Sequence, residues 1–118
     1  MSDNVIEDKS LLFALKVIEI YKVLVYKKKE YVLSKQLLRS GTAIGAMVRE
    51  SKYAQSKSDF IHKLSIGIKE CNETLYWLQL LNKSEYLNDE DYYKIEKLGI
   101  ENLKILPSII VTSKKSIQ

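Results

Sequence analysis

The chain contains one cysteine and one histidine, and this scarcity excludes two classes of protein. The single thiol of Cys71 cannot form an internal disulfide, so the fold does not depend on an oxidising compartment. A histidine-based metal site would need carboxylates or Cys71 beside His62. Because nine residues separate His62 from Cys71 within one predicted helix, their side chains point in opposite directions. We therefore expect no metal site and interpret Cys71 as a small core residue.

Turn-forming residues and long apolar runs are also scarce. The 118 residues include one proline and four glycines, which is typical of helical proteins, whereas sandwiches and barrels need more turn residues. No uncharged apolar run approaches the roughly 20 residues that a helix needs to span a bilayer. The start, MSDN, lacks the basic and apolar regions of a secretory signal. The sequence therefore predicts a single domain, residues 1–118, in the cytoplasm.

Charge is distributed unevenly along the chain. The net charge is +4, but residues 22–63 carry ten basic and three acidic side chains, a balance of +7. Residues 84–101 carry six acidic side chains and two lysines, a balance of −4. A concentrated excess of positive charge is typical of surfaces that bind polyanions, although many basic proteins bind none.

Apolar residues recur at helical spacing in four segments, which predict helices over residues 8–29, 32–53, 57–82 and 89–112. Connections this short place neighbouring helices antiparallel, so the predicted fold is an all-α, up-down-up-down four-helix bundle. Pro107 conflicts with the pattern, because it lacks an N–H and clashes with the carbonyl four residues before it. The last helix is therefore expected to kink or end near residues 103–106.

The second predicted helix has two opposed faces. Gly41 and Gly45 lie one turn apart on an apolar face, and they predict a neighbouring helix packed so closely that any Cβ would clash. The opposite face is basic, with Thr42 and Ala46 at its centre. The candidate residues for binding nucleic acid are Lys35, Arg39, Arg49, Lys52 and Lys57, and the lysine run at 27–29 is the next candidate. The alternative interpretation is a solvated helix surface without a ligand.

The first and third predicted helices carry more apolar residues than one four-helix core can bury. On the third helix several of these residues lie roughly opposite the core stripe, where large apolar side chains are costly to leave in water. We interpret the excess as a subunit interface, and the alternative is a terminal segment folded over it. The candidate interface residues are Ile66, Tyr76, Trp77 and Leu80.

No constellation of residues indicates catalysis. Glu70 and Glu73 are one turn apart, but the Glu-x-x-His pairs of di-iron bundles are absent from the sequence. The two glycines of the second helix follow no strand and precede no Gly-Lys-Ser/Thr, so they do not form a phosphate loop. The sequence predicts a protein that is not an enzyme and that binds no cofactor.

Two blocks of the sequence resemble a known family. The first is YVLSKQLLRSGTAIGA at residues 31–46, and the second is DFIHKLSI at 59–66, followed by KE at 69–70 and ETLYWL at 73–78. Together they are similar to the 23S rRNA intervening-sequence proteins of bacteria, also called four-helix bundle proteins. The resemblance covers most of the chain and implies an antiparallel bundle that assembles into a homopentamer. It also implies kinship with the accessory protein of diversity-generating retroelements, a basic pentameric barrel that binds nucleic acid and a reverse transcriptase.

Two functional hypotheses follow. The leading one is a non-enzymatic homo-oligomer, a pentamer by the resemblance, that binds RNA or DNA through the basic face of the second helix. The alternative is a protein-interaction scaffold that recruits another protein, such as a polymerase, and has little affinity of its own for nucleic acid. Neither hypothesis involves a membrane.

Overall fold

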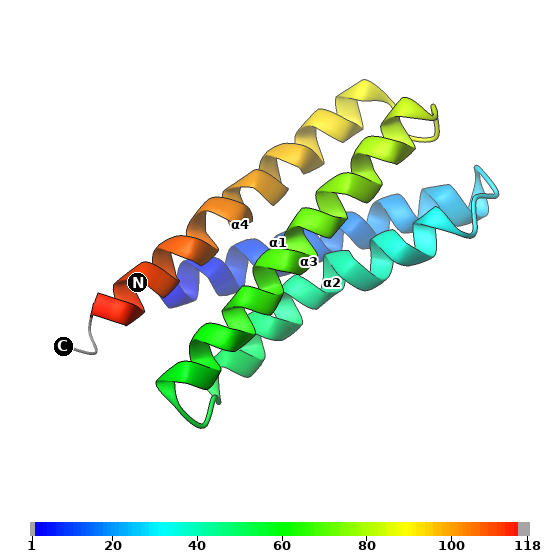
Figure 1. Ribbon diagram of the computed structural model, residues 1–118. Helices are drawn as coiled ribbons and strands as arrows, with labels where there is room; N and C mark the ends of the chain where they lie inside the picture. Colours follow the sequence, from blue (N-terminus) through cyan, green and yellow to red (C-terminus); the bar gives the residue numbers. More distant parts are fainter. Residues whose placement is uncertain (1, 116–118) are drawn as a thin grey trace.

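A computed structural model describes residues 2–115, with side chains described from Val5 onward. This part of the chain forms four helices and no strand, so the all-α prediction is confirmed. The helices are α1 (Ser2–Tyr26), α2 (Leu33–Lys52), α3 (Lys57–Lys83) and α4 (Asp89–Lys115). Each helix runs back alongside the one before it, which gives an elongated molecule of 51 × 22 × 19 Å (Figure 1).

The four helices surround one core. α2 packs against α1 and α3, and α4 packs against α3 and α1. Cys71 is fully buried there, and its thiol donates a hydrogen bond to the Gly99 carbonyl at 3.3 Å. Burial raises the pKa of the Cys71 thiol to about 12, as expected for a core residue. The other large core side chains include Phe13, Val17, Leu24, Leu37, Ile44, Leu64, Leu78 and Leu106.

The connection between α1 and α2 differs from the prediction. α1 begins at Ser2 and ends at Tyr26, so the lysines at 27–29 follow the helix instead of forming its last turn. Lys29 adopts a left-handed φ of 58°, which ends the helical path. The Glu30 carboxylate then accepts hydrogen bonds from the backbone N–H groups of Val32, Leu33 and Ser34 at 3.1, 2.9 and 2.6 Å. These bonds satisfy N–H groups that the first turn of a helix leaves without partners.

The starts of α3 and α4 have ordinary caps. The Ser56 hydroxyl accepts the Asp59 N–H at 3.0 Å, and the Asn88 side-chain oxygen accepts the Asp91 N–H at 2.8 Å. The last helix was expected to kink or end near residues 103–106; an end there is wrong, because the helix continues past Pro107 to Lys115, and the kink stays a prediction. Pro107 lies on the exposed side of α4, so its ring projects into solvent. The carbonyl four residues before it receives no N–H from proline and can bond to water instead.

The two glycines of α2 differ in how closely α1 approaches them. A Cβ on Gly41 would lie 2.8 Å from both methyl carbons of Val17, which is closer than real Cβ contacts. A Cβ on Gly45 would lie 3.4 Å from its nearest neighbour, the Ser10 hydroxyl oxygen. The prediction of a close approach is therefore confirmed at Gly41 and wrong at Gly45. The reason is that α1 presents a branched side chain to Gly41 and a small one to Gly45.

Candidate nucleic-acid interface

The basic face of α2 lies on the outside of the molecule. Because Leu37, Gly41 and Ile44 face the core, the residues on the opposite side of the helix project into solvent. Lys35, Arg39 and Arg49 are exposed in this way. Lys35 and Arg49 are fourteen residues apart, so they lie about 21 Å from each other along the helix axis.

Arg39 is held by acidic residues of α3. Its guanidinium forms ion pairs with Glu70, at 3.3 Å, and with Glu73, and its Nε donates to the Gln36 side chain at 3.3 Å. The indole N–H of Trp77 donates to the same Glu73 carboxylate at 3.0 Å. Two carboxylates thus neutralise the charge of Arg39 and direct its side chain toward α3. Because the Arg39 side chain is half exposed, these pairs contribute only modestly to stability.

Two further candidate residues are engaged by other helices. Lys52 forms an ion pair with Glu7 of α1 at 2.7 Å, and the hydrogen bond to Glu7 raises the pKa of Lys52. Lys57 donates to the backbone carbonyl of Ser113 in α4 at 3.2 Å. Both lysines therefore tie helices of the bundle together. The sequence did not reveal these contacts, because their partners lie more than forty residues away along the chain.

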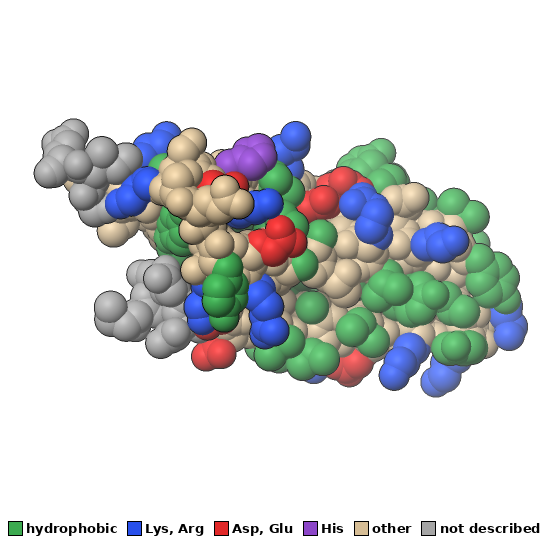
Figure 2. Space-filling view, turned by 90° about the horizontal axis from the view of Figure 1, so that it is seen from below, with side chains coloured by type: hydrophobic (Ala, Val, Ile, Leu, Met, Phe, Trp, Pro, Cys, Tyr) green, Lys and Arg blue, Asp and Glu red, His purple; other side chains and the backbone are tan. Residues whose placement is uncertain are grey.

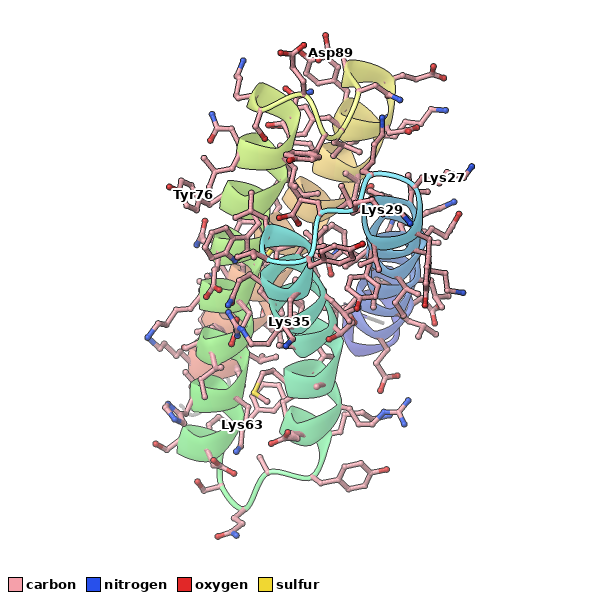
Figure 3. All side chains as sticks on the ribbon, turned by 90° about the vertical axis from the view of Figure 1, so that its right-hand side faces the viewer. Lys27, Lys29, Lys35, Lys63, Tyr76 and Asp89 are labelled. Carbon is pink, nitrogen blue, oxygen red and sulfur yellow. The ribbon has the colours of Figure 1, made fainter. Side chains whose placement is uncertain are left out.

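Described cations without an ion pair lie on several elements, including the α1–α2 connection and α2. Among the side chains that the structure describes, Lys35 and Arg49 form no ion pair, and neither do the three lysines at 27–29. Lys27 and Lys29 lie in the α1–α2 connection, and Lys35 follows in the first turn of α2 (Figure 3). Figure 2 shows basic and hydrophobic side chains side by side at the right-hand end of the face seen from below. Four of these cations thus lie at the α1–α2 connection and the start of α2, and Arg49 lies further along the same helix, beyond the paired Arg39. We call Lys27, Lys28, Lys29, Lys35 and Arg49 the basic band.

The candidate interface residues of α3 are less exposed than predicted. Ile66, Trp77 and Leu80 are half-buried, and Trp77 packs in part against the core. Only Tyr76 is largely exposed, with its ring centroid 5.3 Å from that of Trp77. The Trp77 indole N–H is already paired with Glu73 of the same helix.

The excess of apolar residues predicted on the first helix includes three exposed leucines of α1 that the periodicity did not single out. Leu11, Leu12 and Leu15 are 57%, 42% and 51% exposed. The run LLFAL at residues 11–15 indicated exposed apolar side chains. Successive side chains of a helix point in directions about 100° apart, so five consecutive apolar residues cannot all face one core. Phe13 of this run is fully buried, which leaves the three leucines on the outside. They form an apolar surface that no described residue covers.

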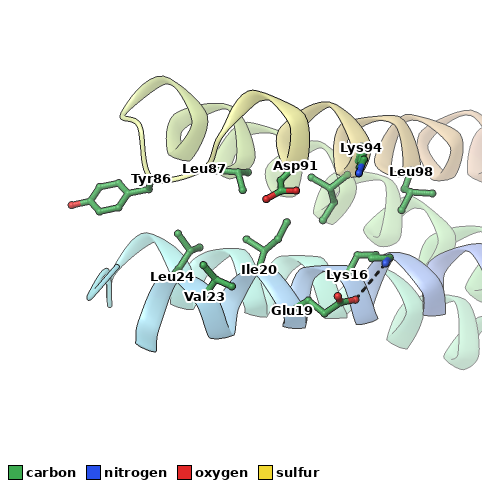
Figure 4. Close-up of a pocket in the computed structure, with 11 residues that line it drawn as sticks. Lys16, Glu19, Ile20, Val23, Leu24, Tyr86, Leu87, Asp91, Lys94 and Leu98 are labelled. Carbon is green, nitrogen blue, oxygen red and sulfur yellow. Dashed lines mark ion pairs between the residues drawn. The ribbon is translucent and has the colours of Figure 1, made fainter. Parts of the chain in front are cut away.

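A cavity of about 300 Å³ lies between α1 and α4 (Figure 4). Its walls are mainly apolar, and the Lys16–Glu19 pair, at 3.5 Å, belongs to its lining. The residues that line it include Ile20, Val23, Leu24, Leu87, Ile95 and Leu98. Tyr86, Asp91 and Lys94 also line it.

Two other findings bear on the kind of protein. Within residues 2–115 no group of three or more histidine, cysteine or acidic side chains is arranged to hold a metal ion. No helix in that same range is long and apolar enough to cross a membrane.

Fold and surface together define the class as an all-α protein of four helices with a basic outer surface and exposed leucines. Residues 2–108 match the family described as 23S rRNA-intervening sequence protein, and the chain belongs to that family. It is also similar to a crystal structure of a protein of unknown function from the S23 ribosomal protein family of Bacteroides thetaiotaomicron. The two chains are 55% identical, with a TM-score of 0.92, over 93% of this chain and 98% of the other. A search of curated proteins gave no match. The family resemblance is thus confirmed, and the kinship with retroelement accessory proteins stays a prediction.

Proposed function

We propose that this protein is a non-enzymatic, antiparallel up-down-up-down bundle that binds RNA or DNA as a homo-oligomer. The observation that carries the proposal is the basic band, whose five side chains have no acidic partner among the described residues. When cations without an acidic partner contact phosphates, they release the counterions condensed on the nucleic acid, and this release drives binding. The proposal moves the contact surface away from Arg39, Lys52 and Lys57, because each of these is engaged within the bundle.

Self-association would strengthen such binding. A ring repeats the basic band once per subunit, and linked weak contacts gain affinity through their high effective concentration. The exposed leucines Leu11, Leu12 and Leu15 supply apolar surface for a subunit contact. The expected number of five subunits comes from the family resemblance and not from this surface.

The first prediction concerns the basic band. Replacing Lys35 and Arg49 together with glutamine should weaken binding to a labelled rRNA fragment several-fold at low salt, and helix content should be unchanged because glutamine is a comparable helix former. The slope of log affinity against log salt should fall by roughly 0.7–0.9 for each phosphate that the variant no longer neutralises. Fluorescence anisotropy at a series of salt concentrations measures both effects.

A matched control distinguishes a binding surface from net charge alone. Lys97→Gln with Lys104→Gln removes the same charge from exposed positions on α4, a helix that does not pack against α2. This pair should leave affinity within about twofold of the wild type. Equal losses in both double variants would contradict the assignment of the basic band, and no loss in either would place the contact surface elsewhere.

The second prediction concerns assembly. Leu11→Gln with Leu15→Gln should convert the oligomer to a smaller species in light scattering, because two exposed apolar side chains leave the proposed contact. Tyr76→Gln, the most exposed of the α3 candidates, serves as the comparison and should leave the assembly intact. Dissociation by Tyr76→Gln alone would contradict the α1 assignment and restore α3 as the interface. A wild-type monomer at micromolar concentration would remove the basis for an oligomer.

The second candidate function is a protein-interaction scaffold. The exposed leucines of α1 favour it, because the same apolar surface fits another protein as well as a second copy of this chain. The anisotropy measurement separates the two candidates, since a scaffold of this kind would show little affinity for rRNA fragments at any salt concentration.

A further inference from the structure

The α1–α2 connection carries exposed aromatic rings on both sides of its lysines. The sequence YKKKEY, at residues 26–31, places Tyr26 directly before the three lysines and Tyr31 shortly after them. Tyr26 is 70% exposed and Tyr31 is 58% exposed, and neither ring packs against another aromatic ring among the described residues. The connection therefore presents flat apolar faces and positive charges together.

The backbone of this connection is held firmly at both ends. The Lys27 and Lys28 N–H groups bond to the Val23 carbonyl at 2.9 and 3.1 Å, and the Glu30 N–H bonds to the Leu24 carbonyl at 2.9 Å. On the α2 side, Glu30 is 9% exposed and accepts three backbone N–H groups. A connection anchored in this way loses little conformational entropy when it binds a ligand.

Acidic residues lie on one side of the same end of the molecule. Lys28 lines a hollow together with Glu85, Asp89 and Asp91, which belong to the α3–α4 connection and the start of α4. In Figure 3 Lys29 lies between Asp89 and Lys35. A phosphate chain would be repelled from the α4 side and attracted toward Lys29 and Lys35, that is, along α2.

We propose that this connection binds single-stranded nucleic acid, with unpaired bases stacked on Tyr26 and Tyr31 and phosphates contacting Lys27 and Lys29. The inference rests on the proposed nucleic-acid function and names the substrate class. In a duplex the faces of the bases are already stacked on one another, so an exposed tyrosine ring reaches a base face only where the strand is unpaired. Interleaved aromatic and basic side chains are the combination with which proteins hold single strands without a strong sequence preference.

The test compares three labelled probes by fluorescence anisotropy: a single-stranded RNA, the single-stranded DNA of the same sequence, and the RNA duplex. The variant is Tyr26→Ala with Tyr31→Ala in the full chain. Its matched control is Tyr53→Ala with Tyr93→Ala, since these tyrosines are 80% and 62% exposed and lie outside the connection. Circular dichroism confirms that each variant retains its helices.

The wild type is expected to bind both single strands more tightly than the duplex. The Tyr26/Tyr31 variant should lose at least about tenfold in affinity for the single strands, because stacking of each base on an aromatic ring contributes about 1–3 kcal/mol. Its affinity for the duplex, and that of the control variant for every probe, should change by less than about threefold. Tyr26→Phe with Tyr31→Phe should restore binding, because phenylalanine keeps the ring face.

Two results would overturn the inference, and they are distinguishable. If the wild type binds the probes in a salt-dependent way but the Tyr26/Tyr31 variant binds single strands as well as the control does, the stacking inference fails and the proposed function stands. If the wild type binds none of the three probes, the proposed function fails and the inference fails with it.

Discussion

Gly41→Ala is expected to lower the free energy of unfolding by about 1–2 kcal/mol, although alanine is the better helix former by roughly 1 kcal/mol. The new Cβ would lie 2.8 Å from both methyl carbons of Val17. Val17 is fully buried and β-branched, so its side chain has one strongly preferred rotamer in a helix and no space to rotate into. The clash is relieved only if α1 and α2 move apart. Thermal or urea denaturation at a fixed subunit concentration measures the loss, because oligomer stability depends on concentration.

Gly45→Ala is the matched comparison for this prediction, and it should raise the free energy of unfolding. Its Cβ would lie 3.4 Å from the Ser10 hydroxyl oxygen and 3.7 Å from the Ser10 Cβ and backbone oxygen, which are ordinary contact distances, so the gain in helix propensity of about 0.5–1 kcal/mol is not offset. The two substitutions are identical and lie one turn apart in the same helix. If both substitutions stabilised the protein, α1 would not approach Gly41 as closely as the 2.8 Å distance to Val17 indicates. Val17→Ala, combined with Gly41→Ala, should recover part of the loss by making room for the new methyl group.

Glu30→Gln is expected to cost about 1–2 kcal/mol of stability at neutral pH, because an ionised cap is replaced by a neutral amide. Glu30 accepts three backbone N–H groups at the start of α2, and charged acceptors bind such donors more strongly than neutral ones. Burial opposes ionisation of Glu30, but these hydrogen bonds outweigh it and lower its pKa. Chemical denaturation measures the difference from the wild type.

The same pKa gives the expected pH dependence. Because the pKa of Glu30 is lower in the folded protein than in the unfolded chain, its stabilisation is present above about pH 5 and is lost as the pH falls through the lowered pKa. The difference between wild type and Glu30→Gln should therefore shrink as the pH falls. Glu85→Gln is the control, since Glu85 lies in the α3–α4 connection with an exposed side chain, and it should change stability by less than about 0.5 kcal/mol. A difference that stays constant down to pH 3 would contradict the role of the charge.

The all-α fold could be predicted because helical periodicity is a local property. The starts of α3 and α4 follow from local caps, Ser56 and Asn88, which stand next to the apolar pattern that they precede. The α1–α2 connection could not be predicted in this way. Its geometry depends on the buried carboxylate of Glu30. In the sequence Glu30 is only one acidic residue within a basic stretch, and nothing there indicates that it is buried.

The candidate site was predicted less well, for a physical reason. Sequence periodicity places Lys35, Arg39 and Arg49 on one face of α2, and the structure exposes all three. Whether a cation is neutralised depends on side chains from other helices, and the sequence does not show which of these come close. Arg39 forms ion pairs with Glu70 and Glu73 of α3, while Arg49 forms no ion pair among the described residues. A cation that is paired within the fold can therefore be told from an unpaired one only when the packed structure is known.

The buried state of Cys71 has a practical consequence for studying this protein in solution. It is the only cysteine of the chain, it lies in the core, and its high pKa keeps the sulfur in the unreactive thiol form at neutral pH. A cysteine introduced on the surface would therefore be the one site that reacts with a maleimide dye, without prior removal of the native thiol. Dyes placed at Tyr53 and at Tyr86, near opposite ends of the molecule, would report subunit orientation within an assembly by energy transfer.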